Sequence, residues 1–135
     1  GIENEEVEKI THICCGYPDK LDAVDYPKAP LNSYQKIANE LNQSIINTVS
    51  LEDAHRYNDL SLLEKFTNTK IIFGVIKIAS SKEETIDEIQ SRINAATKHI
   101  KKEQLIAAPD CGLGHLPRDL AKKKLKVMVD AVKNI

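Results

Sequence analysis

A histidine and two cysteines stand close together near the start of the chain, in the stretch ITHICCGYPD at residues 10–19. Side chains alternate across a β-strand, so in an extended segment His12 and Cys14 point to one face and Cys15 to the other. An imidazole and a thiolate on one face can bind the same metal ion, which adjacent cysteines are poorly placed to do. We therefore take His12 and Cys14 as candidate ligands and expect Cys15 to be a small buried residue.

Two further potential ligands follow later predicted strands. Glu52 comes at the end of the second strand, and Cys111 follows the fourth. Taken singly, Glu52 has the ordinary explanation of an exposed loop carboxylate, and Cys111 that of a small buried residue. The carboxyl ends of parallel strands, however, lie at one edge of a sheet, where ligands collect. The side chains that would meet there are zinc ligands by type. The candidate metal ligands are His12, Cys14, Glu52 and Cys111.

Four other residues have side chains that could bind a ligand or transfer a proton, but each has a simpler explanation. Lys77 ends the third predicted strand and is expected to reach solvent, where it could bind a carboxylate. His55 and His115 are expected in loops. His99 stands near a predicted helix end, where an imidazole interacts favourably with the helix dipole.

Strand and helix patterns alternate four times along the chain, which predicts an α/β fold with a parallel sheet and right-handed crossovers. Asn58 is a candidate cap for the second helix, and Ser81 with Glu84 forms a capping-box pattern before the third. The connection from Gly16 to Ala29 is long for a βα loop, and long loops of this kind often shape a site. The expected strands are 9–15, 44–51, 70–79 and 104–110, and the expected helices are 30–43, 58–66, 81–100 and 118–135.

The length and composition limit the classes of function. The 135 residues suffice for one domain, and four βα units make either a small open sheet or half of an eight-unit barrel. The net charge of −1 gives no reason to expect nucleic acid or an anionic membrane as a partner. Without a visible secretory signal or membrane span, we expect a cytoplasmic location with reduced thiols. Because the chain starts at Gly1 rather than Met, residues 1–9 are expected to be a flexible start or a tag remnant. Residues 1–135 are expected to form a single partial domain.

Four stretches of the sequence resemble one known family. They are THICCGYPDKLD, VSLEDAHRYNDLSLLEKF, IIFGVIKIA and LIAAPDCGLGHLPRDLAKKKLKVMVDA, and they resemble the carboxyl-terminal catalytic barrel of cobalamin-independent methionine synthase over residues 10–135. The most specific elements are PDCGL before a helix, H-x-C, and the S-L-E strand end, in that order. The resemblance implies that the chain is the second half of a (β/α)8 TIM barrel.

The resemblance also implies an activity. The family holds a zinc ion through the same four residues and methylates homocysteine to methionine, and we expect Glu52 to be the ligand that the substrate sulfur displaces. Most homocysteine contacts of the family lie in the first half of the barrel.

Two departures from the family concern the methyl donor. In the folate-using members an Asp-x-His pattern ends the third strand, and its histidine helps to protonate the leaving methylfolate. Here Lys77 and Ala79 stand at those places, and the segment before Glu52 is longer. Both departures are typical of the short core members, so we expect methylcobalamin or a corrinoid protein as donor.

Two other interpretations stay open. The chain could belong to a transferase or lyase that acts on another thiol, such as coenzyme M. Alternatively, it could be a catalytically inactive half-barrel, since four strands cannot close an eight-stranded barrel and leave unpaired edges. We therefore expect a homo-oligomer that forms through the open sheet edges.

Overall fold

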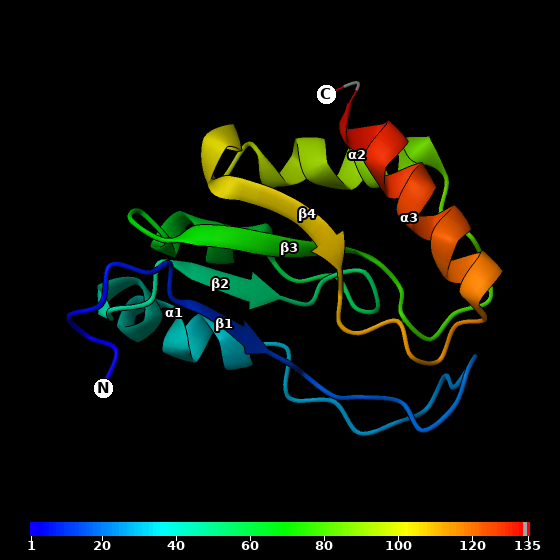
Figure 1. Cartoon of the computed structure of the whole chain (residues 1–135), viewed down its shortest axis with the longest axis horizontal. Helices are drawn as coiled ribbons and strands as arrows, with labels where there is room; N and C mark the ends of the chain where they lie inside the picture. The colour runs from blue at the N-terminus through cyan, green and yellow to red at the C-terminus, as the bar shows by residue number, and fades with distance from the viewer. Residues whose placement is uncertain (134) are drawn as a thin grey trace.

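Four parallel strands form a single sheet in the computed structural model, which describes residues 1–133 and 135. Their order in the sheet follows their order in the chain, so each βα unit places its strand beside the previous one. In Figure 1 all four arrowheads point to the same end of the sheet, and long loops project from that end. The strands are β1 (Ile10–Ile13), β2 (Thr48–Leu51), β3 (Lys70–Ile76) and β4 (Leu105–Pro109).

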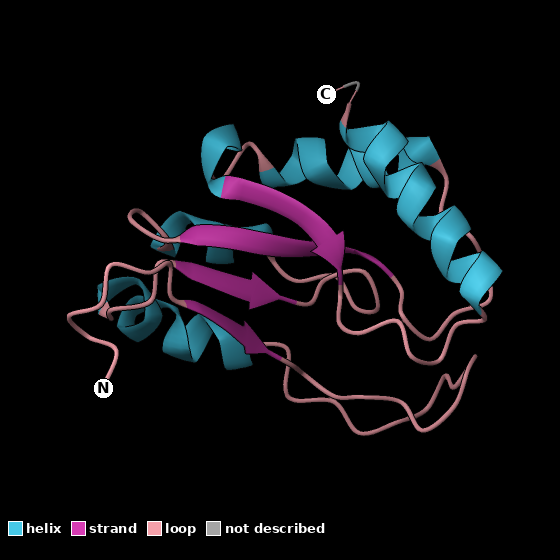
Figure 2. Cartoon of the chain, viewed as in Figure 1, coloured by secondary structure: helices cyan, strands magenta, loops and turns pink. Residues whose placement is uncertain are grey.

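Helices link the strands and cover one face of the sheet (Figure 2). Alternate strand residues such as Val49, Leu51 and Phe73 are buried in one core with Ala38 and Ile93 from the helices. Nearly all residues of β3 are buried, on both of its faces, which explains why this strand reads as an apolar run. The helical elements are α1 (Ser33–Gln43), η1 (Leu60–Lys65), α2 (Ile86–Ala96), η2 (Lys102–Gln104) and α3 (Arg118–Val132).

The other face of the sheet is less buried. One row of paired residues crosses all four strands on this face, and its last member, Ile106, is 42% exposed. A sheet with helices on one face and a more open opposite face matches half of a barrel, so the predicted α/β half-barrel is confirmed. The row consists of His12, Ser50, Ile72 and Ile106.

The second predicted helix differs from the expectation. It is a 3₁₀ helix, and its cap is Asp59, which accepts a hydrogen bond from the Ser61 N–H at 3.0 Å. Asn58 does not cap it, because its side chain donates to the Glu52 carbonyl at 2.7 Å and to Asp53 Oδ1 at 3.0 Å. The Asn58 amide is therefore used to hold the loop after β2.

The third helix begins later than predicted. The capping box is formed by Thr85 and Glu88, with Thr85 Oγ1 accepting from the Glu88 N–H at 3.1 Å and Glu88 Oε2 accepting from the Thr85 N–H at 2.8 Å. The Ser81–Glu84 pattern is wrong because Glu84 accepts from the Lys77 N–H at 2.9 Å and pairs with the buried ammonium of Lys124. The predicted last helix includes residue 134, which lies outside the described residues.

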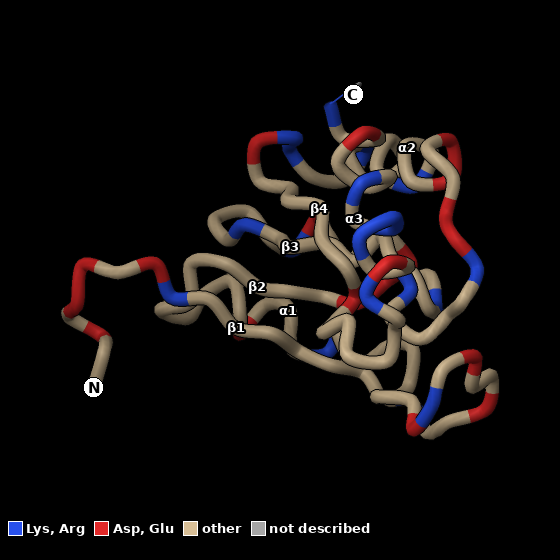
Figure 3. Tube along the Cα trace, turned by 45° about the vertical axis from the view of Figure 1, so that its right-hand side comes forward, with Lys and Arg blue, Asp and Glu red and all other residues tan. Residues whose placement is uncertain are grey.

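Charge is distributed without a strongly basic face. Figure 3 shows acidic and basic residues interspersed over the helices, while the N-terminal segment is mostly acidic. No helix within the described residues is both long and apolar enough to cross a membrane.

Candidate metal centre

The four predicted ligands come together at the carboxyl end of the sheet. Each offers one ligand atom, and these atoms all lie within 4.8 Å of one another. Tetrahedral zinc, with ligand bonds of about 2.0–2.3 Å, places its ligand atoms within about 4 Å of each other, so small side-chain rotations would close the set. The residues come from the ends of three strands: His12 and Cys14 from β1, Glu52 from β2 and Cys111 from β4.

The strand register orients His12. Its Cα pairs with that of Ser50 on β2, and His12 Nδ1 lies 2.9 Å from Ser50 Oγ. The other ring nitrogen, Nε2, lies 3.9 Å from Glu52 Oε1. With Nδ1 held by the hydroxyl, Nε2 is the nitrogen available to a metal, which is the usual arrangement of a metal-binding imidazole.

The Glu52 carboxylate is buried and held on one side. Its Oε2 accepts hydrogen bonds from the Cys15 N–H at 3.1 Å and from the Cys15 thiol at 2.7 Å. The remaining oxygen, Oε1, faces His12. The arrangement therefore presents one carboxylate oxygen to the ligand set.

Cys15 has a function that sequence reasoning missed. It packs against the core as a partly buried side chain. Its thiol and N–H nevertheless both reach Glu52, because the chain turns after β1. The only signal in the sequence is its position next to a ligand, which does not identify its partner.

Tyr34 on α1 ties the first two strands together beside the ligands. Its hydroxyl donates to the Ile13 carbonyl at 2.8 Å and accepts from the Glu52 N–H at 3.1 Å. A single buried hydroxyl thus sets the distance between the end of β1 and the end of β2. Sequence periodicity marks Tyr34 only as a core residue.

Asp110, directly before Cys111, fastens the loop after β2. It is 1% exposed and accepts three backbone N–H groups, from Asp53 and Ala54 on Oδ1 at 2.8 and 2.9 Å and from His55 on Oδ2 at 2.7 Å. Burial raises the pKa of Asp110 to about 6, although the three N–H groups lower it, so the carboxyl is ionised at neutral pH. Gly74 is required beside it, because a Cβ there would collide with Asp110 Oδ1.

Asp53 fixes the same loop from the opposite side. Its buried carboxylate binds Arg92 of α2 through two hydrogen bonds, at 2.6 and 2.8 Å. Arg92 also donates to the Asn58 carbonyl at 2.9 Å. The segment that follows Glu52 is therefore held by α2 as well as by β4.

The thiols are poor ligands until a cation is present. Partial burial, with a hydrogen bond to Glu52, raises the pKa of Cys14 to about 11. Burial and the same carboxylate raise the pKa of Cys15 to about 12. Both thiols are therefore protonated at neutral pH, and a metal ion bound by Cys14 must displace its proton.

The connection over residues 16–29, called the arch below, spans the carboxyl edge of the sheet. Its two ends meet where the Ala29 N–H donates to the Cys15 carbonyl at 2.6 Å. Gly16 has φ of +148°, and a Cβ there would collide with the Pro27 carbonyl, so glycine permits this closure. Farther along, the Asp22 N–H donates to the Ala79 carbonyl at 2.8 Å. The arch therefore reaches from β1 to the loop after β3.

The remaining histidines lie outside the ligand set. His55 Nε2 accepts the Ala79 N–H at 3.2 Å, and burial lowers the pKa of His55 to about 4. His115 binds the Pro18 carbonyl of the arch through Nε2 at 2.9 Å. His99 Nδ1 lies 2.6 Å from Glu64 Oε1, so its hydrogen-bond partner is a side chain. Lys77 is exposed at the end of β3, as predicted.

Comparisons with known proteins agree on one family. Residues 30–134 match the model of the cobalamin-independent synthase catalytic domain. The methionine synthase of Pyrococcus abyssi is 34% identical over 103 residues, which cover 76% of this chain and 30% of that protein. That of Methanothermobacter thermautotrophicus is 31% identical over 127 residues, which cover 93% of this chain and 40% of that protein.

A solved structure extends the match to the arch and β1. The B12-independent methionine synthase from Shewanella sp. W3-18-1, in complex with selenomethionine, superposes with a TM-score of 0.84 at 25% identity, covering 98% of this chain and 39% of that one. The chain thus spans between about 30 and 40% of the length of these relatives. Together, the family match and the shared fold show that the chain belongs to the cobalamin-independent synthase catalytic-domain family.

Proposed function

We propose that this chain carries the metal-binding part of an enzyme that methylates a small thiol, with homocysteine as acceptor and methionine as product. The observation that carries the proposal is the set of one imidazole, two thiols and one carboxylate whose ligand atoms lie within 4.8 Å in a member of this family. The relatives are named methionine synthases, and the Shewanella enzyme binds selenomethionine, a methionine analogue.

The donor set fits zinc, which His12, Cys14, Glu52 and Cys111 would hold. When bound, zinc stabilises the thiolate form of a coordinated sulfur, which makes a weakly acidic thiol nucleophilic at neutral pH. The protein groups prepare one position for exchange. Glu52 offers a single oxygen, and its other oxygen keeps two hydrogen bonds from Cys15. The carboxylate can therefore give up its place to a sulfur without leaving a wholly unpaired charge in a buried site.

We also propose a corrinoid methyl donor rather than methylfolate. Proton donation to a leaving amine requires an acid at the end of β3, where this chain has the buried methyl group of Ala79. His55 is nearby, but its Nε2 is engaged by the Ala79 N–H, and its lowered pKa of about 4 keeps the ring neutral at pH 7. A methyl–cobalt donor needs no such acid, because cobalt leaves without being protonated.

The test combines metal content with substrate choice. We expect one zinc per chain, and we expect the longest gene product carrying this sequence to convert homocysteine to methionine with methylcobalamin. Comparing the rate with methyltetrahydrofolate against that with methylcobalamin identifies the methyl donor. Comparing the rate with coenzyme M against that with homocysteine identifies the acceptor. Transfer from methyltetrahydrofolate at an equal rate contradicts the corrinoid proposal. Absence of zinc and of transfer to either thiol contradicts the enzymatic proposal.

The open edges favour a second candidate, a self-associating half-barrel. β1 and β4 form the edges of the described sheet, and Ile10 on β1 is 56% exposed while Ile106 on β4 is 42% exposed. Unpaired edges with apolar side chains promote pairing with a second copy. Light scattering on the isolated chain distinguishes the states. We expect a dimer, and a monomer at high concentration contradicts this candidate.

A further inference from the structure

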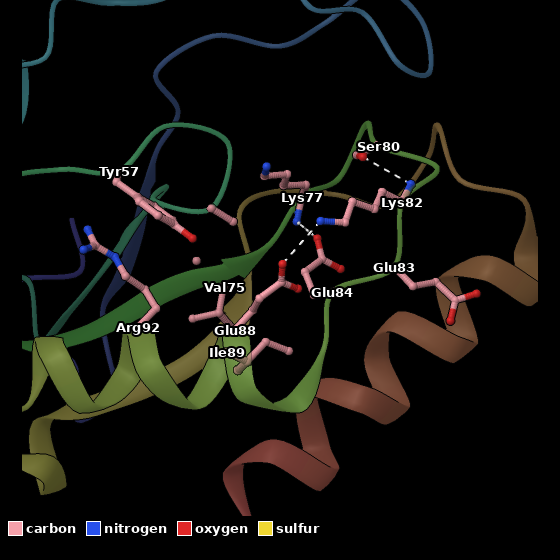
Figure 4. Close-up of a pocket in the computed structure, with 12 residues that line it drawn as sticks. Tyr57, Val75, Lys77, Ser80, Lys82, Glu83, Glu84, Glu88, Ile89 and Arg92 are labelled. Carbon is pink, nitrogen blue, oxygen red and sulfur yellow. Dashed lines mark hydrogen bonds and ion pairs between the residues drawn. The ribbon is translucent and has the colours of Figure 1, made fainter.

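A hollow beside the metal centre is lined by the arch and by the loop after β3. It has a volume of about 260 Å³, large enough for part of a small substrate. A second pocket, between β3 and α2 (Figure 4), offers only about 60 Å³. Its charged walls are also neutralised in pairs, since Lys82 binds Glu88 at 3.3 Å and Arg92 binds Asp53. The hollow under the arch is therefore the better candidate for a ligand. Its polar lining consists of Asp22, Tyr26, Lys28, His55, Lys77 and Ser80.

The hollow carries an excess of positive charge. Lys28 Nζ lies 4.1 Å from the centre of the Tyr26 ring, a cation–π contact that holds the ammonium in place. In Figure 4 the Lys77 side chain points away from the carboxylates of Glu84 and Glu88. Within the described residues, neither lysine forms an ion pair with a carboxylate. The lining therefore offers two ammonium groups to a ligand.

Only one lining carboxylate opposes the two lysines. Asp22 Oδ1 accepts the Ser81 N–H at 2.7 Å, so that oxygen serves the backbone of the loop after β3. His55 adds no charge, because its ring is neutral at pH 7. Since His55 Nε2 accepts the Ala79 N–H, the ring proton is on Nδ1 and makes His55 a hydrogen-bond donor. Two cations and one neutral donor form a lining suited to an anion.

The hollow adjoins the candidate metal centre. His55 lines it, three residues after Glu52, and the His55 N–H donates to Asp110, which directly precedes Cys111. Tyr26 and His55 also make an edge contact, with ring centres 6.3 Å apart. A ligand in the hollow would therefore lie next to whatever binds the metal.

We propose that Lys28 and Lys77 bind an anionic group, a carboxylate or a phosphate, of the substrate that reacts at the metal centre. The proposal rests on the proposed function for the identity of that substrate. Two sources share this chemistry: the carboxylate of an amino-acid thiol acceptor and the phosphate of a corrinoid donor. Lys77 thus has a binding role at the position where folate-using relatives carry an aspartate.

A direct binding experiment tests the anion site without any reaction. The chain, freed of metal, is titrated with inorganic phosphate and followed by amide chemical shifts. We expect Lys28→Met and Lys77→Met each to weaken phosphate binding about tenfold, as charge-assisted hydrogen bonds do. Lys77→Arg keeps the charge and should retain binding, and Lys36→Met on α1 is the matched control. Unchanged phosphate affinity in the folded double variant overturns the proposal.

Kinetics on the longest gene product identify the source of the anion. Homocysteine is compared with 3-aminopropanethiol, which lacks the carboxylate, and methylcobalamin with methylcobinamide, which lacks the phosphate. The double lysine variant should raise KM about tenfold or more for the one substrate whose anion binds, and leave KM for its truncated analogue unchanged. Equal effects of the variant on every substrate overturn the proposal. Lysine-dependent phosphate binding without zinc or methyl transfer would instead leave the anion site standing and refute the proposed function.

Discussion

The candidate metal centre and the hollow lie at the same edge of the sheet but are built differently. The candidate metal ligands stand on strand ends or directly after them, where the ladder between β1 and β2 sets the spacing of those on the first two strands. The hollow is formed by the arch, which is attached at a few points such as the contact from Asp22 to Ala79. Strands fix the position of reacting groups, while a loop can vary to select the substrate.

Supports around the two regions differ in the same way. Behind the metal centre, the buried carboxylates of Asp53 and Asp110 tie β2, α2 and β4 into one unit. In the hollow, Lys28 rests on Tyr26, and the side chain of Lys77 is exposed. Substitutions in the first region should therefore affect metal binding and stability, whereas substitutions in the second should affect substrate affinity alone.

The largest expected effect is the loss of metal on removal of one thiolate. We expect Cys14→Ser or Cys111→Ser to lower zinc affinity by about a thousandfold or more, because each removes a soft ligand from a set of four. Competition with a chromophoric chelator measures the affinity, and Co²⁺ substitution shows the loss of sulfur-to-metal absorption.

Cys15→Ser is the matched control for both ligand variants. It removes the third thiol of the chain while keeping a hydroxyl that can donate to Glu52. We expect its zinc affinity to stay within a few-fold of that of the unchanged chain. A loss as large as that of Cys14→Ser would mean that Cys15 is itself a ligand and that the assignment from strand alternation is wrong.

The next effect concerns the support beneath the metal centre. Asp110→Ala leaves three buried N–H groups without an acceptor, and we expect it to lower the free energy of unfolding by about 3 kcal/mol. Asp110→Asn keeps the oxygen that can serve Asp53 and Ala54 and should cost about half as much. Urea denaturation measures both. Equal stability of Asp110→Ala and the unchanged chain would show that this network does not hold the site.

Much of the fold could be predicted because it depends on patterns that a sequence displays. Buried parallel strands read as apolar runs, and four βα units with right-handed crossovers predict a parallel sheet, which the structure has. Helix caps were less predictable. In both wrong cap predictions, the side chain forms a tertiary contact instead of capping its helix. Asn58 donates to a carbonyl of the loop after β2. Glu84 accepts from the Lys77 N–H and pairs with Lys124. Such competition is invisible until the elements are packed.

The candidate site also combines features that the sequence predicts with features that depend on tertiary structure. Strand alternation and the carboxyl-end rule sufficed to select the four residues that the structure brings together, because both follow from backbone geometry. The roles of Cys15 and Asp110 depend on how the chain turns after each strand, and no spacing encodes that. The hollow was not predicted either, since it requires the course of the arch over residues 16–29.

Metal binding should depend on pH in a defined direction. The pKa of Cys14 is about 11 in the chain without metal, so its thiol is protonated at pH 6–8, and binding of zinc releases that proton. Affinity should therefore rise about tenfold for each pH unit from this thiol alone. Chelator competition at pH 6, 7 and 8 measures the slope, which should be shallower in Cys14→Ser. A pH-independent affinity would contradict thiolate ligation by Cys14.

The smallest expected effect separates a ligand from the residue that positions it. Cys15→Ala removes the thiol donor to Glu52 Oε2 but leaves the backbone donor at 3.1 Å, so the carboxylate stays in place with one hydrogen bond fewer. We expect zinc affinity to fall about tenfold, as is usual when a group that orients a ligand is lost. Phosphate affinity in the hollow should not change, because Lys28 and Lys77 remain.

The control is Cys15→Ser, which should restore zinc affinity, since a hydroxyl also donates. If Cys15→Ser and Cys15→Ala bind zinc equally weakly, packing of the sulfur rather than its hydrogen bond supports Glu52. If Cys15→Ala weakens phosphate binding as much as zinc binding, the two regions are one mechanical unit, and the contrast between strand-built and loop-built sites fails for this molecule.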